Sequence, residues 1–425
     1  MKIIALFVFA LSVLISLKAS ASVMLIPREI KRIEDKAFAN DSSLSTLILP
    51  EGLLSIGEKA FADSGVKTVH FPKSISEIAD NAFDGCEFEA VAKTGTYAYE
   101  YCKTRGIKVH KTAEEYEGTL TIYTPLADEI IDTALLEFEA LYTNVQFDIL
   151  CMSDEYCLKR MASENAHGSD LIWGIGAQYI NEYRQYLLPY IPKNISNIDL
   201  CFRDQDCYWT SMAARLPVFL VNTDKVGKKD IPRTWKDLAN SKWKGKIVIA
   251  NPTSTSDAFL VLCNILMAFG TAVDDYDSGW RFLSSLKDNL VIQSRALYAH
   301  QKVDKGEYPI AIVMEETASQ YQHDIKGAHL SVVYPEDGII VVPEIVAIEK
   351  GCSDSELAKL FVDFISGNDW QTTQETSCNQ RPIINNATML LKPSLDELNI
   401  IPFDYSYVDN NRTIIIERWK QLFIK

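Results

Sequence analysis

A run of four hydroxyl residues, Thr253 to Ser256, is the stretch whose residue types and position best suit ligand chemistry. It follows an apolar segment expected to form a strand, Ile247–Ala250, and precedes an expected helix, Asp257–Phe269. The start of a helix leaves about four backbone N–H groups without partners and carries roughly half a positive charge, so hydroxyls there suit a phosphate, a carboxylate or a similar oxyanion. An ordinary helix cap has the same composition, and both interpretations stay open. The candidate ligand residues of this run are Thr253, Ser254 and Thr255.

A second candidate is the acidic pair Glu315 and Glu316, which follows an apolar strand expected at Ile310–Met314. Two carboxylates near an oxyanion site would suit a ligand with an anionic end and an amine or hydroxyl end; a solvated pair at a strand end is the alternative. Arg295 is expected to pair with an anion or with one of these glutamates. The remaining candidates lie near the ends of other expected strands, with a core position as the alternative for Tyr208: Thr124, Ser169, Trp173, Gly174 and Tyr208.

The segments around these candidates alternate between short strands and longer helices, which indicates an α/β fold. Ligands bind such sheets beyond the carboxyl ends of the strands, so these side chains should meet there. The expected order from residue 119 onward is strand Leu120–Tyr123, helix Leu126–Tyr142, strand Val145–Leu150, strand Asp170–Gly174 and helix Gln178–Tyr186.

The chain has 425 residues, a formal net charge of −15 and a pI near 5.0. This balance argues against binding nucleic acid or an anionic membrane surface, since both need clustered Lys and Arg. Residues 1–21 combine Lys2, an apolar run Ile3–Leu17 and the small residues Ala19-Ser20-Ala21, the pattern of a signal peptide. No later run reaches the roughly 18 apolar residues of a membrane span. We therefore expect an exported protein that is periplasmic, at the cell surface or secreted.

Nine cysteines are compatible with disulfide bonds in an exported chain. The odd number leaves at least one unpaired within the chain, and sequence does not fix the pairing. No Cys-x-x-Cys or matching histidine spacing occurs, so a zinc site is not expected, and no cofactor is expected either. The candidate local pairs are Cys151 with Cys157, Cys201 with Cys207, and Cys352 with Cys378.

Residues 22–110 contain an internal repeat, marked by Pro27, Pro50 and Pro72 and by Ala-Phe pairs in the same register. One unit is too small to bury its own face, so neighbours should stack into a short solenoid. The pattern Ile-x-x-x-Ala-Phe followed by Leu/Val-x-x-Leu/Val-x-Leu/Phe-Pro resembles the leucine-rich repeats of bacterial surface proteins of the BspA type. The resemblance implies about three units that act as a spacer or dock on a protein partner. Residues 111–118 are the expected linker.

Seven further motifs follow in order: Asp170-Leu-Ile-Trp-Gly, Cys207-Tyr-Trp-Thr, Val221-Asn-Thr-Asp, Arg233-Thr-Trp-Lys-Asp-Leu, Lys242-Trp-Lys-Gly-Lys with Asn251-Pro-Thr-Ser-Thr-Ser, Gly306-Glu-Tyr and Gln380-Arg-Pro. They are similar to family 1 extracellular solute-binding proteins of ABC importers, in the ferric-ion, thiamine, phosphonate and sugar-phosphate branch. The resemblance implies a domain over 119–425 with two α/β lobes that close on a solute. Lobe one would comprise about 119–222 and 341–425, and lobe two about 223–340. Both final helices, expected at Glu356–Ser366 and Thr413–Leu422, would belong to lobe one.

That family implies capture of a small anionic or zwitterionic solute, bearing a phosphate, phosphonate or carboxylate, and its delivery to an ABC permease in the membrane. Ferric iron is an alternative solute, although ferric relatives carry two adjacent tyrosines around Met314–Thr317 and this chain has no such pair anywhere. A surface interaction or adhesion protein that acts through the repeats is the other alternative. Catalysis is not expected, because the nucleophile, zinc-protease and phosphate-loop motifs of enzymes are missing.

Overall fold

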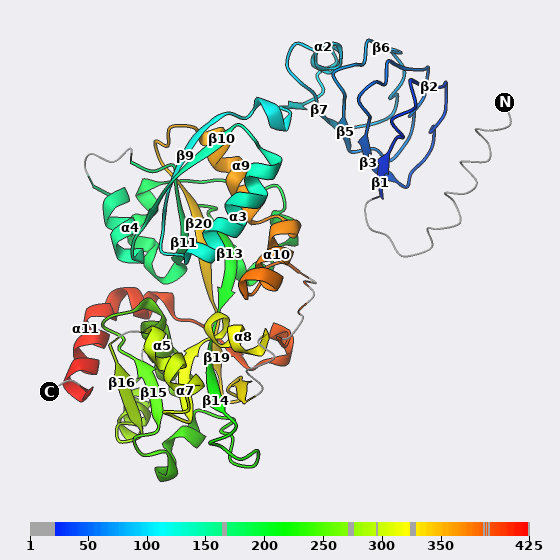
Figure 1. The fold of residues 1–425 in the computed structure, drawn as a ribbon. Coiled ribbons are helices and arrows are strands. Elements are labelled where there is room, and N and C mark those ends of the chain that lie inside the picture. The colour runs from blue at the N-terminus through cyan, green and yellow to red at the C-terminus, as the bar shows by residue number, and fades with distance from the viewer. Residues whose placement is uncertain are drawn as a thin grey trace. The chain divides into compact units, whose positions relative to one another are not determined.

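The structure is a computed structural model that describes residues 22–163, 168–270, 276–294, 296–323, 329–385, 387, 389 and 392–423. The signal peptide predicted at 1–21 lies outside these residues. The chain divides into two compact units (Figure 1). One unit runs to Glu117 and includes the loop Leu141–Asn144, and the other comprises Gly118–Ala140 and everything from Val145. Within the described residues, no helix has both the length and the apolar character that a membrane crossing requires.

The first unit is a stack of short parallel strands held by the predicted Ala-Phe pairs. Phe61 is fully buried, and its ring stacks between Phe38 and Phe83 at centroid distances of 5.3 and 5.1 Å. α2 (Tyr97–Thr104) follows the last turn of the stack. One sheet has the order β1 (Ser22–Leu25), β3 (Leu44–Ile48), β5 (Thr68–His70), β7 (Glu89–Val91) and β8 (Val109–His110), and the other the order β2 (Arg32–Ile33), β4 (Ser55–Ile56) and β6 (Glu77–Ile78).

The expected linker at 111–118 is folded onto the first unit over part of its length. It contains a short 3-10 helix, η1 (Ala113–Glu115), closed by reciprocal hydrogen bonds between Thr112 and Glu115. The Glu115 carboxylate also accepts the backbone N–H of Thr94 at 2.9 Å. Burial raises the pKa of Glu115, but the hydrogen bonds from Thr94 and Thr112 outweigh this effect and bring the pKa down to about 2. This segment therefore packs as a continuation of the repeats.

Lobe one of the second unit is a mixed sheet with helices packed against it. The sheet order is β10 (Val145–Cys151), β9 (Gly118–Thr124), β11 (Leu171–Gly176), β20 (Val342–Glu349) and β12 (Leu187–Leu188), with β13 (Thr210–Arg215) also paired to β20. Its helices are α3 (Asp128–Leu141), α4 (Asp154–Met161), α9 (Ser355–Ile365) and α10 (Asn368–Cys378). The helix expected at Gln178–Tyr186 is instead two 3-10 helices, η2 (Ala177–Tyr179) and η3 (Asn181–Tyr186).

Lobe two has its own five-stranded sheet, and two of its strands have the predicted bounds. The sheet order is β16 (Leu290–Gln293), β15 (Ile247–Ala250), β17 (Ile310–Met314), β14 (Pro217–Asn222) and β18 (Leu330–Val333). Its helices are α5 (Ser256–Phe269), α6 (Asp277–Ser285), α7 (Ala296–Asp304) and α8 (Glu315–His323). Two short strands, β19 (Ile339–Ile340) and β21 (Ile400–Ile401), pair with each other. The segment before β15 contains two 3-10 helices, η6 (Lys236–Ala239) and η7 (Ser241–Trp243).

The chain first crosses between the lobes at a single residue, Leu216. β13 ends at Arg215 in the sheet of lobe one, and β14 begins at Pro217 in the sheet of lobe two. The crossing expected at Asn222–Thr223 therefore comes earlier in the chain, because β14 pairs with β17 and β18 over its whole length.

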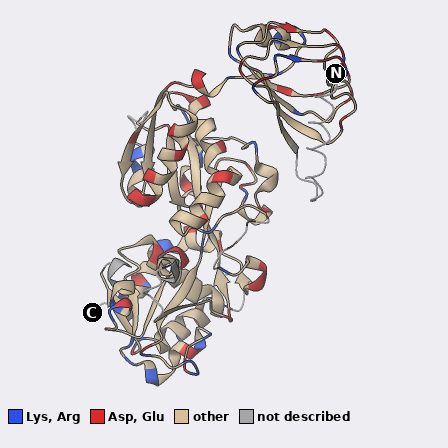
Figure 2. Cartoon of the chain, turned by 45° about the vertical axis from the view of Figure 1, so that its right-hand side comes forward, with Lys and Arg blue, Asp and Glu red and all other residues tan. Residues whose placement is uncertain are grey.

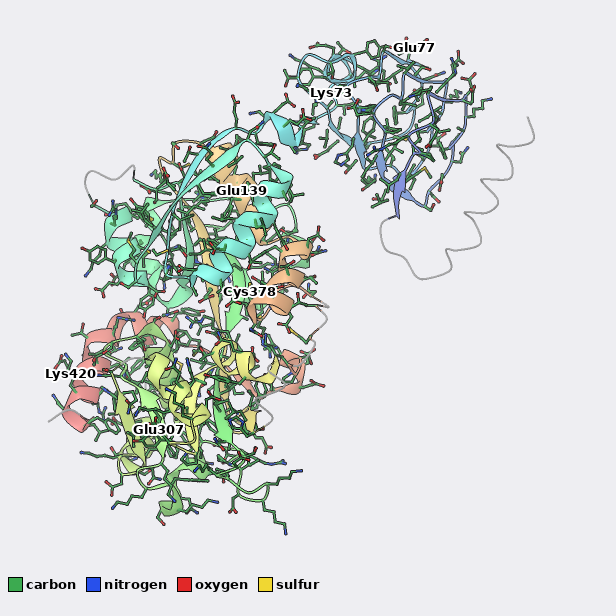
Figure 3. The ribbon with its side chains drawn as sticks, viewed as in Figure 1. Lys73, Glu77, Glu139, Glu307, Cys378 and Lys420 are labelled. Atoms are coloured by element: carbon green, nitrogen blue, oxygen red, sulfur yellow. The ribbon has the colours of Figure 1, made fainter. Side chains whose placement is uncertain are left out.

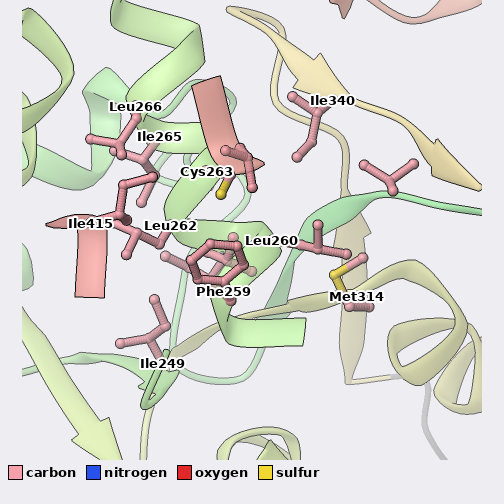
Figure 4. Packing of buried hydrophobic residues seen from close by; sticks show 14 of the residues in the cluster. Ile249, Phe259, Leu260, Leu262, Cys263, Ile265, Leu266, Met314, Ile340 and Ile415 are labelled. Carbon is pink, nitrogen blue, oxygen red and sulfur yellow. The ribbon is translucent and has the colours of Figure 1, made fainter. Parts of the chain in front are cut away.

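The last helix, α11 (Tyr405–Phe423), contacts both lobes, so it does not belong to lobe one alone as expected. Ile415 lies beside α5 (Figure 4), and the Tyr276 hydroxyl donates to Asp404 at 2.7 Å just before α11 begins. Arg418 on α11 pairs with Asp277 on α6 at 2.9 Å. An apolar stripe shows that one face of a helix is buried without showing which surface buries it.

All nine cysteines are free thiols, so none of the candidate disulfide pairs is formed. Cys378 ends α10 (Figure 3) in a buried position, whereas Cys352 is half-buried in the turn after β20. Cys157 lies on the buried face of α4, and burial raises its thiol pKa to about 12. A thiol with so high a pKa stays protonated and unreactive at neutral pH.

Candidate functional site

The crossing at Leu216 brings strand ends from both lobes to one place. β11 ends at Gly176, opposite Glu344 on the neighbouring strand β20, and β13 ends at Arg215. On the other side of Leu216, Pro217 lies opposite Met314, the last residue of β17. Because ligands bind where such strand ends meet, this region is the candidate solute site.

Glu315 is held in a fully buried ion pair with Arg381. The guanidinium donates through Nε to Oε2 at 2.9 Å and through Nη2 to Oε1 at 2.6 Å, and both side chains are at most 1% exposed. Arg381 also donates to the carbonyl of Pro393 at 2.9 Å. The Glu315 carboxylate is thus committed to an internal partner and is not free to select a solute.

Glu316 belongs to a second cluster, centred on Arg215, which we call the Arg215 cluster. Arg215 donates to Glu316 Oε1 at 2.9 Å, pairs with Glu344 at 3.2 Å, and contacts Asp257 in the first turn of α5. Arg215 and Glu344 come from lobe one, whereas Glu316 and Asp257 come from lobe two. Three carboxylates therefore share one guanidinium across the two lobes.

The excess of carboxylates is visible in the pKa values. Burial raises the pKa of Glu344 to about 8, a rise that Glu316, Asp154 and Asp257 reinforce and Arg215 opposes. Burial also raises the pKa of Glu316, although Arg215 opposes this rise as well. Carboxylates without enough cationic partners favour the protonated form in such a site. The cluster consequently favours the protonated form of Glu344.

The hydroxyl turn before α5 is both a cap and an exposed surface. Thr255 is the N-cap of α5, and its Oγ1 accepts the N–H of Ala258 at 3.2 Å, so the cap interpretation is confirmed. Thr253 and Ser254 are exposed, and the N–H of Thr253 donates to the side chain of Asn251 at 3.0 Å. The turn follows Ala250, the last residue of β15, and so lies at the carboxyl end of this strand in lobe two. It therefore leaves two hydroxyls open toward solvent.

Three candidates from lobe one have structural roles at the same strand ends. Thr124 is fully buried, and its hydroxyl accepts the N–H of Leu126 at 3.1 Å. Gly174 has a φ of +83°, and a Cβ there would overlap the side chain of Leu126. Trp173 is fully buried and packs edge-on against Phe361 at 5.3 Å. Trp173 is thus a core residue in this structure.

Two other candidates, Ser169 and Tyr208, lie away from this site. Ser169 precedes β11 at the opposite edge of the sheet, where its hydroxyl donates to Glu349 at 2.5 Å. Tyr208 is half-buried, with the Arg184 guanidinium 4.8 Å from its ring centroid. Arg295 lies outside the described residues.

Sequence reasoning missed three polar residues near the strand ends. Asp154 begins α4 and accepts the N–H of Gly176 at 3.0 Å. Gln178 in η2 is 3% exposed, and Arg412 on α11 donates to the Tyr179 hydroxyl at 3.0 Å. No local pattern marks them, because each comes from a different part of the chain. In the described part of the chain, no group of three or more His, Cys, Asp or Glu residues is arranged to hold a metal ion.

Comparison with known proteins identifies the family. The profile of the bacterial extracellular solute-binding proteins matches residues 174–409, more than half of the chain, so the chain belongs to this family. BspA-type leucine-rich repeats match residues 17–89 in six copies, whereas the spacing of the prolines indicated about three units. The protein is thus a periplasmic solute-binding protein of an ABC importer with leucine-rich repeats before it. Members of this family bind solutes and are not enzymes.

The acidic residues of this chain are spread along the helices of both lobes (Figure 2).

Two relatives cover most of the solute-binding unit. An uncharacterised protein of Haemophilus influenzae is 27% identical over 321 residues, 72% of this chain and 90% of that protein. A probable ABC transporter periplasmic-binding protein of Sinorhizobium fredii is 24% identical over 288 residues, 67% of this chain and 79% of that protein. The solved structure of the periplasmic binding protein AfuA from Actinobacillus pleuropneumoniae, with fructose-6-phosphate bound, superposes with a TM-score of 0.62 at 22% identity, covering 72% of this chain and 99% of that one.

The names of two relatives with shorter matches mention a solute. A putative 2-aminoethylphosphonate-binding periplasmic protein of Salmonella typhimurium is 24% identical over 151 residues, 34% of this chain and 43% of that protein. The major ferric iron-binding protein of Neisseria gonorrhoeae is 26% identical over 168 residues, 38% of this chain and 48% of that protein.

Proposed function

We propose that the solute of this importer subunit is a small molecule with a phosphate, phosphonate or carboxylate group. The observation that carries the proposal is the turn before α5, which presents the exposed hydroxyls of Thr253 and Ser254 at the start of a helix. Thr255 uses its own hydroxyl for the N–H of Ala258, which leaves the N–H groups of the two residues before Ala258 without a partner inside the helix. Those groups and the two hydroxyls together suit an oxyanion.

The relatives support an organic oxyanion more than a metal ion. One binds fructose-6-phosphate and another is named for 2-aminoethylphosphonate, both of which carry a phosphorus oxyanion. Ferric relatives carry two adjacent tyrosines around Met314–Thr317, which this chain lacks. The carboxylates found there, Glu315 and Glu316, are paired with Arg381 and Arg215 and are not free as ligands. Delivery would follow closure of the two lobes and docking on a membrane permease. The repeats would serve as a spacer or a docking module for a protein partner.

Ser254→Ala should weaken solute binding by about 1 to 3 kcal/mol, because a hydroxyl that donates to a charged group contributes about that much. The cap on α5 stays intact in this variant, since Thr255 supplies it. Isothermal titration of the full chain with fructose-6-phosphate, 2-aminoethylphosphonate and their carboxylate analogues measures the change.

Ser241→Ala is the matched control, because Ser241 is also an exposed serine but lies before β15 at the other end of that strand. It should leave the affinity unchanged. If Ser254→Ala and Ser241→Ala bind the solute equally well, the hydroxyl turn is not the oxyanion site. Binding of ferric iron in place of every organic oxyanion would contradict the proposal as a whole.

A further inference from the structure

Between the two lobes, three polar atoms are enclosed by protein without a hydrogen-bond partner among the described residues. Two are the amide nitrogen and oxygen of Gln178, and the third is Nη1 of Arg412. The Gln178 amide lies beside the Tyr179 hydroxyl without reaching a hydrogen bond of ordinary geometry. Enclosing a polar atom without a partner is costly, so folded proteins rarely leave such atoms together unless something else binds them.

Arg412 is positioned firmly for such a role. Its guanidinium lies between two aromatic rings, 4.3 Å from the centroid of Tyr179 in lobe one and 4.2 Å from that of Phe259 in lobe two. Nη2 donates to the Tyr179 hydroxyl at 3.0 Å, which fixes the plane of the group and leaves Nη1 without a partner. A guanidinium held in this way presents a free donor to an oxyanion.

Gly176 connects Gln178 to an acidic group. Its N–H donates to Asp154 at 3.0 Å, and a Cβ at this position would overlap the Gln178 amide. Asp154 and Gln178 are therefore neighbours around one glycine, and only glycine leaves space for that amide. Burial raises the pKa of Asp154, an effect that a nearby cation would reverse.

Around Tyr179 and Gly176 the chain thus places a positive group, Arg412, a neutral amide, Gln178, and a negative group, Asp154. An amide can donate to an oxyanion and accept from an ammonium group at the same time. We propose that Arg412, Gln178 and Asp154 form a solute-binding subsite for a small zwitterion, with its oxyanion at Arg412 and its ammonium group at Asp154. The subsite rests on the proposed function and narrows the solute to oxyanions that also carry an amine.

Gln178→Leu tests the subsite without a solute. Replacing the amide by an apolar group of similar size should leave the melting temperature of the solute-binding unit unchanged or raise it, because no hydrogen bond is lost. The control is Gln371→Leu: Gln371 is equally buried but donates to the carbonyls of Met212 and Ile365 and accepts from Ile383. That variant should melt roughly 3 °C lower or more, since it leaves backbone groups unpaired. A comparable fall for Gln178→Leu would show that the amide is structural and overturn the proposal.

The binding measurement uses three pairs of probes that differ only in the amine. They are 2-aminoethylphosphonate with ethylphosphonate, phosphoethanolamine with ethyl phosphate, and β-alanine with propionate. In calorimetry on the full chain, at least one amine-bearing probe should bind, and its partner without the amine should bind at least tenfold more weakly. Gln178→Leu and Arg412→Lys should each weaken that binding by roughly tenfold or more. Arg418→Lys, on the same helix but paired with Asp277, should leave it unchanged.

The outcomes separate this inference from the proposed function. Equal binding of both members of a pair would overturn the zwitterion subsite and leave the oxyanion proposal standing. If none of the six probes binds but fructose-6-phosphate does, the zwitterion subsite fails and the oxyanion proposal stands. If fructose-6-phosphate does not bind either, both proposals fail.

Discussion

Arg381→Met should lower the free energy of unfolding of the solute-binding unit by about 3 to 5 kcal/mol, because it leaves the buried carboxylate of Glu315 without its cation. The substitution also removes the donor to the Pro393 carbonyl. Urea unfolding followed by tryptophan fluorescence measures this change. All seven tryptophans lie between Trp173 and Trp419, so the signal comes from this unit and not from the repeats.

The double variant Arg381→Met with Glu315→Met should recover much of that loss, since two apolar side chains replace both charges. The matched surface control is Lys359→Met, which breaks an exposed pair with Glu356 on α9. Such a pair contributes at most about 0.5 kcal/mol. A loss for Arg381→Met no larger than that of Lys359→Met would mean that the pair is hydrated and not buried.

The solute-binding unit should lose stability as the pH rises toward 8, and Glu344→Gln should remove much of this loss. The folded pKa of Glu344 is about 8, above the ordinary value of 4.5 expected in the unfolded chain. Between these values the folded state holds a proton that the unfolded state has released, so stability is greatest below the lower value. It falls by about 1.4 kcal/mol for each pH unit up to about 8. Glu316 and Asp154, whose pKa values are also raised, act in the same direction.

Urea titrations at pH 5.5, 7 and 8.5 test this dependence. Glu344→Gln keeps a polar group beside Gln380, which donates to Glu344 at 3.1 Å, and should be more stable than the native chain at pH 8.5. The control is Glu336→Gln, because Glu336 forms an exposed pair with Arg233. The free energy of unfolding of this variant should change with pH in parallel with that of the native chain. Parallel curves for Glu344→Gln would show that Glu344 does not take up a proton on folding.

Local patterns predicted much of the fold. The strands at Ile247–Ala250 and Ile310–Met314 were predicted with their observed bounds because each is a continuous apolar run with a clear end. The cap at Thr255 was predicted for the same kind of reason, since it depends on a few adjacent residues. The contacts of α11 with lobe two were missed because its partner residues on α5 and α6 are far away in the sequence.

The site was harder to predict because its interactions join distant residues. Glu315 and Glu316 lie at a strand end as expected, but their partners Arg381 and Arg215 are 66 and 101 residues away. Nothing next to the glutamates shows that arginines will neutralise them. Gln178 looked like an ordinary helix residue, and only the fold shows that its amide is enclosed without a partner. Unpaired atoms of this kind can be found only after the surrounding chain is placed.

The Arg381 pair also lies at the point where the chain crosses between the lobes. The carbonyl of Arg381 accepts the N–H of Ala214 at 2.9 Å, and the N–H of Glu315 donates to the carbonyl of Leu216 at 2.9 Å, so both partners are tied to the crossing. Separating the pair would cost about 3 to 5 kcal/mol, which is as large as the few kcal/mol that usually divide open and closed states. Any rotation of the lobes therefore leaves Glu315 and Arg381 in place, and the residues that sense closure must lie at a greater radius from them.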